Sequence, residues 1–150
     1  MKNKNNTLTR REFLAQSGKA IIVSGLTVGG AVSCAVTATY RGVVRDGRLL
    51  VDIKLYPELE NPGGGVIFEL QDLPKPILLI NVDGKKFNAL SAMCTHMGCT
   101  VSLSKNFILC PCHGSTYNLE GKVLRGPAQK DLKNYKLKKN NGRVEININS

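Results

Sequence analysis

Histidine, tryptophan and aromatic residues in general are scarce in this sequence of 150 residues. It contains two histidines, no tryptophan and 5% aromatic residues. Because only two imidazoles are available, every metal site that needs three or more histidine ligands is excluded. Apolar residues make up 42% and charged residues 21%, which is typical of a globular protein and excludes a disordered chain. The length allows one compact domain and a tail, but not two full domains.

Acidic residues are outnumbered, so nucleic-acid binding has to be considered. The net charge is +10. Residues 1–40 carry five basic and one acidic side chain, residues 41–120 carry eight of each, and residues 121–150 carry eight basic and two acidic. The basic C-terminal region has one aromatic residue, Tyr135, and alternates like strands instead of forming a recognition helix. We therefore predict no nucleic-acid binding; a solvated basic face, or one that meets an acidic protein partner, accounts for the charge.

The first forty residues carry a targeting pattern. A basic segment, Thr9-Arg10-Arg11-Glu12-Phe13-Leu14, precedes the uncharged residues from Ala20 to Tyr40. This pattern closely resembles the twin-arginine export signal, whose pathway carries folded proteins with their cofactors. Because about 20 apolar residues span a bilayer, we predict that residues 1–40 are a twin-arginine signal that stays attached as a membrane anchor. The alternatives are lipid attachment at Cys34, which follows Ala31-Val32-Ser33, and cleavage near Ala38.

Short strands are expected throughout residues 41–150. Alternating or turn-bounded apolar segments predict strands over 49–55, 66–70, 77–82, 85–90, 134–138 and 143–148. Asp83-Gly84 predicts a two-residue hairpin turn, and the Pro-Gly-rich run 61–65 predicts a loop. No pattern typical of a helix follows the N-terminal segment. The predicted fold class is therefore all-β, a small antiparallel sandwich or barrel preceded by one hydrophobic, helical segment.

Cysteine and histidine gather in two clusters. The first is Cys94-Thr95-His96-Met97-Gly98-Cys99, and the second is Cys110-Pro111-Cys112-His113-Gly114-Ser115-Thr116-Tyr117. Four of the five cysteines and both histidines lie in these clusters, which predicts a metal site instead of scattered core thiols. A tetrahedral zinc would accept two thiolates and two imidazoles, but it would leave an extra cysteine in each cluster unexplained. In an oxidising compartment, a disulfide can tie two such loops together.

These motifs, together with Gly126-Pro127-Ala128, closely resemble the Rieske iron–sulfur proteins of quinol-oxidising cytochrome bc and b-f complexes. The resemblance covers about residues 45–150, and bacterial members also carry a twin-arginine anchor. It implies a Rieske-type β-fold over 41–150, with a small subdomain at about 91–128 that binds one [2Fe–2S] cluster. It also implies that Cys94 and Cys110 bind one iron, that His96 and His113 bind the other, and that Cys99 and Cys112 form a disulfide.

The resemblance also assigns groups around the cluster. In the high-potential type, a serine hydroxyl reaches a bridging sulfide and a tyrosine hydroxyl reaches a ligand thiolate. Ser115 and Tyr117 occupy those positions in this sequence. Hydrogen bonds to sulfur stabilise the added electron, so they raise the potential. Gly126 and Pro127 match the loop that covers the cluster in this family.

One interval in the motif is short. Thirteen residues separate His96 from Cys110, fewer than most members of the family have. Residues 100–109 can therefore form only a tight hairpin, with its tip at residues 104–106. We expect the ligands to be unaffected, and the surface around the histidines to differ from that of the well-known complexes.

By the same resemblance, the chain is an electron-transfer subunit and an enzyme only as part of a complex. His96 and His113 would take part in proton-coupled electron transfer from quinol, in a pocket completed by a cytochrome b-type subunit. A c-type cytochrome would accept the electron. The domain would lie on the periplasmic face of a bacterial cytoplasmic membrane. The alternative is the Rieske small subunit of an exported molybdenum oxidoreductase such as arsenite oxidase.

Other classes of protein fit this sequence less well. An oxygenase catalytic subunit needs a further iron site with two histidines and one carboxylate, and both histidines are already assigned. A simple ferredoxin needs neither an export signal nor the additional cysteine pair. A zinc-stabilised binding module without redox activity is the hypothesis from a different class, and metal analysis distinguishes it.

Overall fold

Strands account for nearly all of the regular structure in the computed structural model, which describes residues 37–71 and 73–150. The strands are β1 (Ala38–Gly42), β2 (Val44–Arg45), β3 (Arg48–Asp52), β4 (Gly65–Leu70), β5 (Leu73–Asn81), β6 (Phe87–Ser91), β7 (Ser102–Leu103), β8 (Ile108–Leu109), β9 (Thr116–Tyr117), β10 (Val123–Arg125), β11 (Asn134–Tyr135), β12 (Leu137–Asn140) and β13 (Arg143–Asn147). Two short 3-10 helices, η1 (Ile53–Leu55) and η2 (Pro57–Leu59), follow β3.

The N-terminal predictions fall on residues that the structure does not describe. The twin-arginine motif and Cys34 both lie in the segment 1–36, outside the described residues. Within residues 37–71 and 73–150, no helix is both long enough and apolar enough to cross a membrane.

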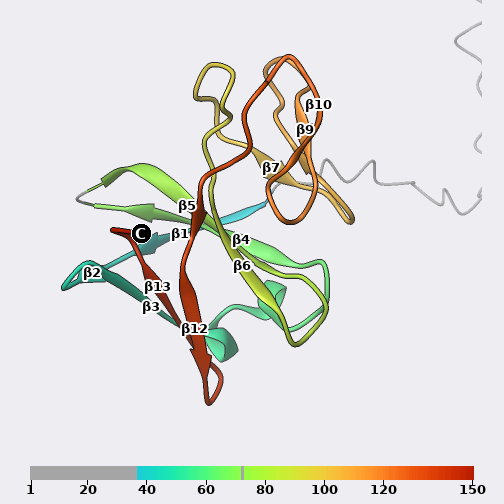
Figure 1. The fold of residues 1–150 in the computed structure, drawn as a ribbon. Helices are drawn as coiled ribbons and strands as arrows, with labels where there is room; N and C mark the ends of the chain where they lie inside the picture. The colour runs from blue at the N-terminus through green and yellow to red at the C-terminus, as the bar shows by residue number, and fades with distance from the viewer. Residues whose placement is uncertain (1–36, 72) are drawn as a thin grey trace, which may run out of the picture. The chain divides into compact units, whose positions relative to one another are not determined.

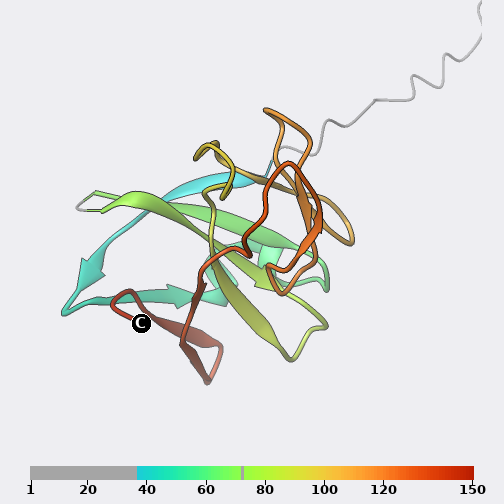
Figure 2. The same ribbon diagram turned by 45° about the horizontal axis from the view of Figure 1, so that its top comes forward.

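The strands form three sheets (Figure 1, Figure 2). A five-stranded sheet has the order β1-β4-β5-β6-β11, a second sheet has β12-β13-β3-β2, and a small third sheet has β10-β9-β8-β7. Neighbouring strands run antiparallel, except that β1 runs parallel to β4. In Figure 1 the small sheet lies toward the top, and β3, β12 and β13 lie toward the bottom. The predicted all-β class is confirmed.

The five-stranded sheet is the middle layer, because alternate residues of its strands pack into different cores. Phe68 and Leu79 pack with residues of β3 and β13. Ile67 and Leu78 point to the other face, where they pack with residues of the small sheet. A strand that is buried on both faces needs an apolar run in place of alternation, which explains the consecutive buried residues 77–80. The small sheet therefore packs against a five-stranded sheet whose central strand β5 is buried on both faces.

Three local predictions are wrong. The strand predicted over 134–138 is two strands, β11 and β12, which belong to different sheets. The strand predicted over 49–55 ends at Asp52, whose carboxylate accepts a hydrogen bond from the Lys54 amide (3.2 Å) at the start of η1. The two-residue turn predicted at Asp83-Gly84 is a longer loop between β5 and β6. In this loop Asp83 Oδ1 accepts hydrogen bonds from the amides of Lys86 (2.6 Å) and Lys85 (2.9 Å). These two bonds hold the pKa of Asp83 below its ordinary value.

Two hairpins are confirmed. The C-terminal hairpin of β12 and β13 turns at Asn141-Gly142. Its alternating apolar residues are buried, as expected for one face of the sheet: Val144, Ile146 and Ile148. The short hairpin over residues 100–109 is also present, because β7 pairs with β8 and leaves Lys105-Asn106 at the tip.

The glycine run 63–65 allows the loop before β4 to pass close to other backbone segments. A Cβ added to Gly64 would collide with the carbonyl oxygen of Glu58. Because backbone atoms cannot rotate away, Gly64→Ala is expected to destabilise the fold by about 1–3 kcal/mol. Thermal denaturation measures the loss, and Gly126→Ala is the control because the atom nearest to its added Cβ lies 3.6 Å away. Equal melting temperatures for the two variants would contradict this account.

Candidate metal centre

Two loops that carry the cysteine and histidine clusters close with the same backbone hydrogen bonds. The Gly98 amide donates to the Cys94 carbonyl (2.8 Å), and the Gly114 amide donates to the Cys110 carbonyl (3.0 Å). The Cys94 amide also donates to the Cys99 carbonyl, and the Cys110 amide donates to the Ser115 carbonyl, both at 2.8 Å. Gly98 and Gly114 have φ values of 77° and 74°, a left-handed conformation that favours glycine. The shared Cys-to-Gly spacing therefore produces two equivalent turns.

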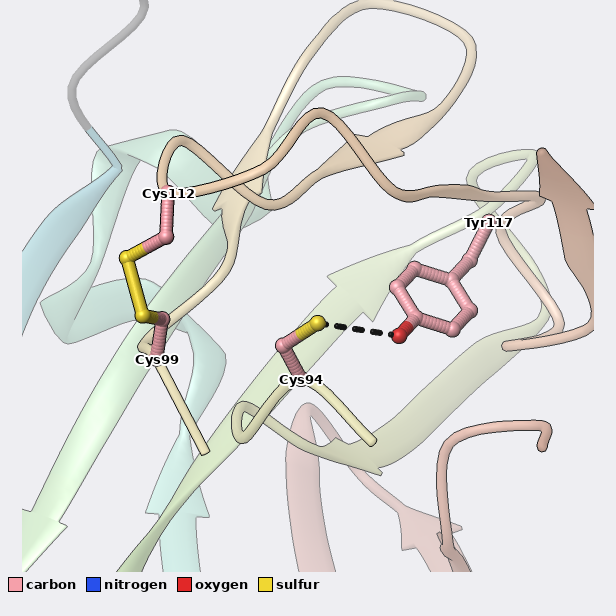
Figure 3. Close-up of a disulfide and its surroundings, with 4 residues drawn as sticks. All are labelled: Cys94, Cys99, Cys112 and Tyr117. Carbon is pink, nitrogen blue, oxygen red and sulfur yellow. Dashed lines mark hydrogen bonds between the residues drawn. A yellow bond between two sulfur atoms is a disulfide. The ribbon is translucent and has the colours of Figure 1, made fainter. Parts of the chain in front are cut away.

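The disulfide expected between the loops is present. The sulfur atoms of Cys99 and Cys112 are 2.08 Å apart, and their Cα atoms are 6.5 Å apart (Figure 3). The Cys110 sulfur lies within 4.8 Å of both disulfide sulfurs, but these two have no thiolate to offer a metal. Among the described residues, the free cysteines are Cys94 and Cys110, and both are buried.

The free thiols and the two imidazoles form a set of four donors. His96 and His113, one from each loop, are exposed, and their ring centroids lie 4.9 Å apart with the ring planes at 90°. Each of the two thiols, Cys94 and Cys110, contributes to the pKa of the other. The structure thus places the four predicted ligands as two pairs, the buried thiols of Cys94 and Cys110 and the exposed imidazoles of His96 and His113.

Tyr117 makes the best-defined contact of the sulfur pair. Its hydroxyl lies 3.2 Å from Cys94 Sγ (Figure 3), and the residue is fully buried. Burial raises the pKa of the Cys94 thiol, but hydrogen bonds from Tyr117, from the His96 amide and from Ser115 outweigh burial and lower this pKa. Burial also raises the pKa of Cys110. Burial and the bond to Cys94 raise the pKa of Tyr117, so its phenol stays protonated and able to donate.

The loop that begins with Gly126-Pro127 is fastened to the second cysteine loop. The Ala128 amide donates a hydrogen bond to Ser115 Oγ (3.0 Å), and both residues are buried. Gly126 and Pro127 are exposed. Ser115 Oγ accepts from Ala128, so its own proton remains available for donation, and Ser115 contributes to the lowered pKa of Cys94.

A second attachment of this loop involves a residue that sequence reasoning missed. The Thr95 hydroxyl donates to the carbonyl oxygen of Lys130 at 2.5 Å. Thr95 also contacts the Tyr117 hydroxyl, through its own hydroxyl (3.1 Å) and through its amide (3.2 Å). The hydroxyl of Thr95, between Cys94 and His96, could have been noticed in the sequence as a possible hydrogen-bond donor. Its partner could not, because Lys130 contributes only its backbone carbonyl, which every residue has.

The donor set fits a [2Fe–2S] cluster with mixed ligands. A Rieske centre needs two cysteines and two histidines, whereas an all-cysteine cluster needs four thiolates. The described residues offer two free thiols, two adjacent imidazoles, and the Tyr117 hydroxyl in contact with the sulfur of Cys94. An all-β domain with these residues has the donor set of an iron–sulfur protein in which thiolates and imidazoles share the cluster.

Comparison with known proteins identifies the family. The Rieske [2Fe-2S] domain matches residues 55–136, so the chain belongs to the Rieske [2Fe–2S] family and its cofactor is one such cluster. The chain is 32% identical over 131 residues to the cytochrome b6-f complex iron-sulfur subunit of Chlorobaculum tepidum, covering 81% of this chain and 71% of the relative. It is 41% identical over 96 residues to cytochrome b6-f complex iron-sulfur subunit 2 of Synechocystis sp., covering 61% of this chain and 53% of that relative.

The fold also occurs in proteins of distant sequence. A chain in the solved complex of reduced oxygenase and oxidized ferredoxin in carbazole 1,9a-dioxygenase matches with a TM-score of 0.58 and 22% identity. The match covers 69% of this chain and 95% of the other. At this level of identity the likeness concerns the fold alone, and it agrees with the predicted Rieske-type β-architecture.

Proposed function

We propose that this protein is the electron-transfer subunit of a quinol-oxidising, cytochrome bc-type complex, which receives one electron from quinol and passes it to a c-type cytochrome. The main observation is the exposed imidazole pair, His96 and His113, together with two buried free thiols, of which Cys94 contacts the Tyr117 hydroxyl. The relatives named cytochrome b6-f iron-sulfur subunits support this assignment.

Four side chains would hold the cluster. Cys94 and Cys110 would bind one iron, and His96 and His113 would bind the other. When bound, the cluster supplies a one-electron redox centre whose potential is raised by the imidazole ligands. Cys94 and Cys110 are 3% and 1% exposed, so water is kept from the sulfur side. The exposed imidazoles leave the opposite side open to a partner.

The imidazoles have a second role, which is to move a proton. A neutral imidazole that binds a metal through one nitrogen keeps the other nitrogen for a hydrogen bond. In its neutral form the ring already carries a proton on that nitrogen, so it can accept another proton only after releasing the first. Because His96 and His113 are both exposed, a quinol hydroxyl would reach either ring, and a ring that has released its proton would take the proton of the quinol. The same nitrogen then releases the proton to solvent. The disulfide between Cys99 and Cys112 holds the two loops, and so the two rings, in place.

The rest of the proposal concerns the whole protein and its complex. Residues 1–40 would form the twin-arginine signal and membrane anchor. Residues 41–150 would form the Rieske domain, with its cluster-binding part at about 91–128, on the periplasmic face of a bacterial cytoplasmic membrane. A cytochrome b-type subunit would complete the quinol pocket.

Purification of the full chain with its native complex tests this function. We expect co-purifying b-type haem, seen in the visible spectrum, and reduction of c-type cytochrome by added quinol. A molybdopterin-containing partner in place of b-type haem would contradict the proposal and support the alternative of a small subunit of an exported molybdenum oxidoreductase.

Hydrogen bonds to sulfur are expected to set a high midpoint potential, in the upper part of the Rieske range of roughly −150 to +300 mV. Ser115→Ala and Tyr117→Phe should each lower it without loss of the cluster. A hydrogen bond to a charged group contributes about 1.5–3 kcal/mol and 59 mV corresponds to about 1.4 kcal/mol, so each loss can reach about 100 mV. Redox titration followed by electron paramagnetic resonance (EPR) measures the shift. Thr116→Val is the control, because Thr116 points to the opposite side of β9 from Tyr117; unchanged potentials in the first two variants would contradict this role.

A further inference from the structure

Four polar groups form a row of successive contacts: the Cys94 sulfur, the Tyr117 hydroxyl, the Thr95 hydroxyl and the Lys130 carbonyl. The Tyr117 hydroxyl is 3.2 Å from Cys94 Sγ and 3.1 Å from Thr95 Oγ1. Thr95 Oγ1 is in turn 2.5 Å from the carbonyl oxygen of Lys130. When Cys94 is a ligand thiolate, which carries no proton, these three contacts share the protons of two hydroxyl groups, one on Tyr117 and one on Thr95. At any moment, one of the three contacts therefore lacks a full hydrogen bond.

The proton of Thr95 has a fixed place in this row. A carbonyl oxygen only accepts hydrogen bonds, so the 2.5 Å contact requires Thr95 to donate to Lys130. A threonine hydroxyl has one proton, so Thr95 cannot donate to Tyr117 at the same time. Thr95 consequently presents Tyr117 with an oxygen lone pair.

The proton of Tyr117 then has two acceptors. The Cys94 sulfur and the Thr95 oxygen lie at nearly equal distances from it. Tyr117 has no exposed surface, so water cannot supply another partner. Because a hydrogen bond weakens steeply as it bends, a proton directed at Thr95 is a weaker donor to Cys94.

We propose that Thr95 is a positioning residue that draws the Tyr117 hydrogen bond partly away from Cys94 and so holds the midpoint potential below the value that Tyr117 alone would set. This rests on the proposed function, in which Cys94 is a cluster ligand. A hydrogen bond to a ligand sulfur favours the more negative, reduced state, and sharing that bond disfavours it. Lys130 takes part because its carbonyl turns Thr95 into an acceptor toward Tyr117.

Removal of the Thr95 hydroxyl tests the proposal, and the expected sign is distinctive. Thr95→Val leaves Cys94 as the sole acceptor for Tyr117, so the midpoint potential of the full chain should shift to more positive values in an EPR-monitored redox titration. Thr95→Ser keeps the hydroxyl and should restore the wild-type potential. Thr100→Val, which removes a neighbouring threonine hydroxyl outside the row, should leave the potential unchanged.

A second background shows whether Thr95 acts through Tyr117. In a Tyr117→Phe protein there is no shared proton, so adding Thr95→Val should produce no further shift. A negative shift or no shift for Thr95→Val, or an equal shift in both backgrounds, would overturn the proposal. If Thr95→Val does not fold, Thr95→Ala gives the same test. A wild-type chain without a [2Fe–2S] EPR signal would overturn the proposed function instead.

Discussion

Replacing His113 with alanine is expected to abolish cluster binding, with loss of the visible absorbance and of the EPR signal of the reduced protein. His113 is one of only two imidazoles in the chain, so no other histidine can take its place. The nearest cysteines cannot substitute either, because Cys99 and Cys112 are held in a disulfide. One iron would therefore keep His96 as its single protein ligand. Because altering a group that merely orients a ligand already costs about 10–100-fold in metal affinity, loss of the ligand itself should cost more.

The measurement separates loss of the cluster from loss of the fold. The reduced wild-type protein should show an EPR signal with an average g below that of all-cysteine clusters, and metal analysis should find iron. His113→Ala should keep the far-ultraviolet circular dichroism of a β-protein while losing the signal. Met97→Ala is the matched control, because Met97 is 70% exposed in the other loop and offers no imidazole. Zinc in the wild-type protein, or a full EPR signal in His113→Ala, would contradict the ligand assignment.

Removing the disulfide with a Cys99→Ala and Cys112→Ala double variant is expected to lower the apparent melting temperature by about 10 °C. A bridge across a loop of this size contributes about 3 kcal/mol, and each kcal/mol corresponds to roughly 4 °C in a domain of about 100 residues. Both cysteines are replaced so that no new free thiol competes for iron. Without the bridge the loops separate more readily, so His96 and His113 should release the cluster at a lower temperature than the wild-type protein does.

Two probes follow this variant during heating. Visible absorbance reports the cluster, and far-ultraviolet circular dichroism reports the strands. Thr100→Ala is the control, because it changes the residue next to Cys99 and leaves the disulfide intact. Melting of the double variant at the wild-type temperature by both probes would show that the disulfide has no stabilising role.

The sequence was informative where spacing fixes chemistry. The interval from Cys94 to Gly98 equals that from Cys110 to Gly114, and both become the same hydrogen-bonded turn. The disulfide between Cys99 and Cys112 followed from the family resemblance and is confirmed. Alternation along β13 also predicted its buried face correctly. In the two turns and along β13, local residue types indicate the structure, whereas the disulfide pairing needed the family resemblance.

The misses arose where a backbone group or a distant segment decides the structure. The Asp52 and Asp83 carboxylates capture nearby amides, so they end a strand and lengthen a turn in ways that alternation does not reveal. The parallel pairing of β1 with β4 joins segments far apart in the chain. The contact of Thr95 with the Lys130 carbonyl spans 35 residues and leaves no side-chain signal at Lys130.

The middle position of the five-stranded sheet determines which parts of the molecule open first. Residues 77–80 of β5 have no exposed surface, they pair with β4 and β6, and they are covered on both faces. We therefore expect their amides to exchange hydrogen with solvent only when the whole domain opens, whereas smaller fluctuations suffice for the more exposed cysteine loops. Loosening of the metal site and unfolding of its support are therefore separate events with separate free energies. We therefore expect the cluster to be lost at a lower temperature than that at which the five-stranded sheet unfolds.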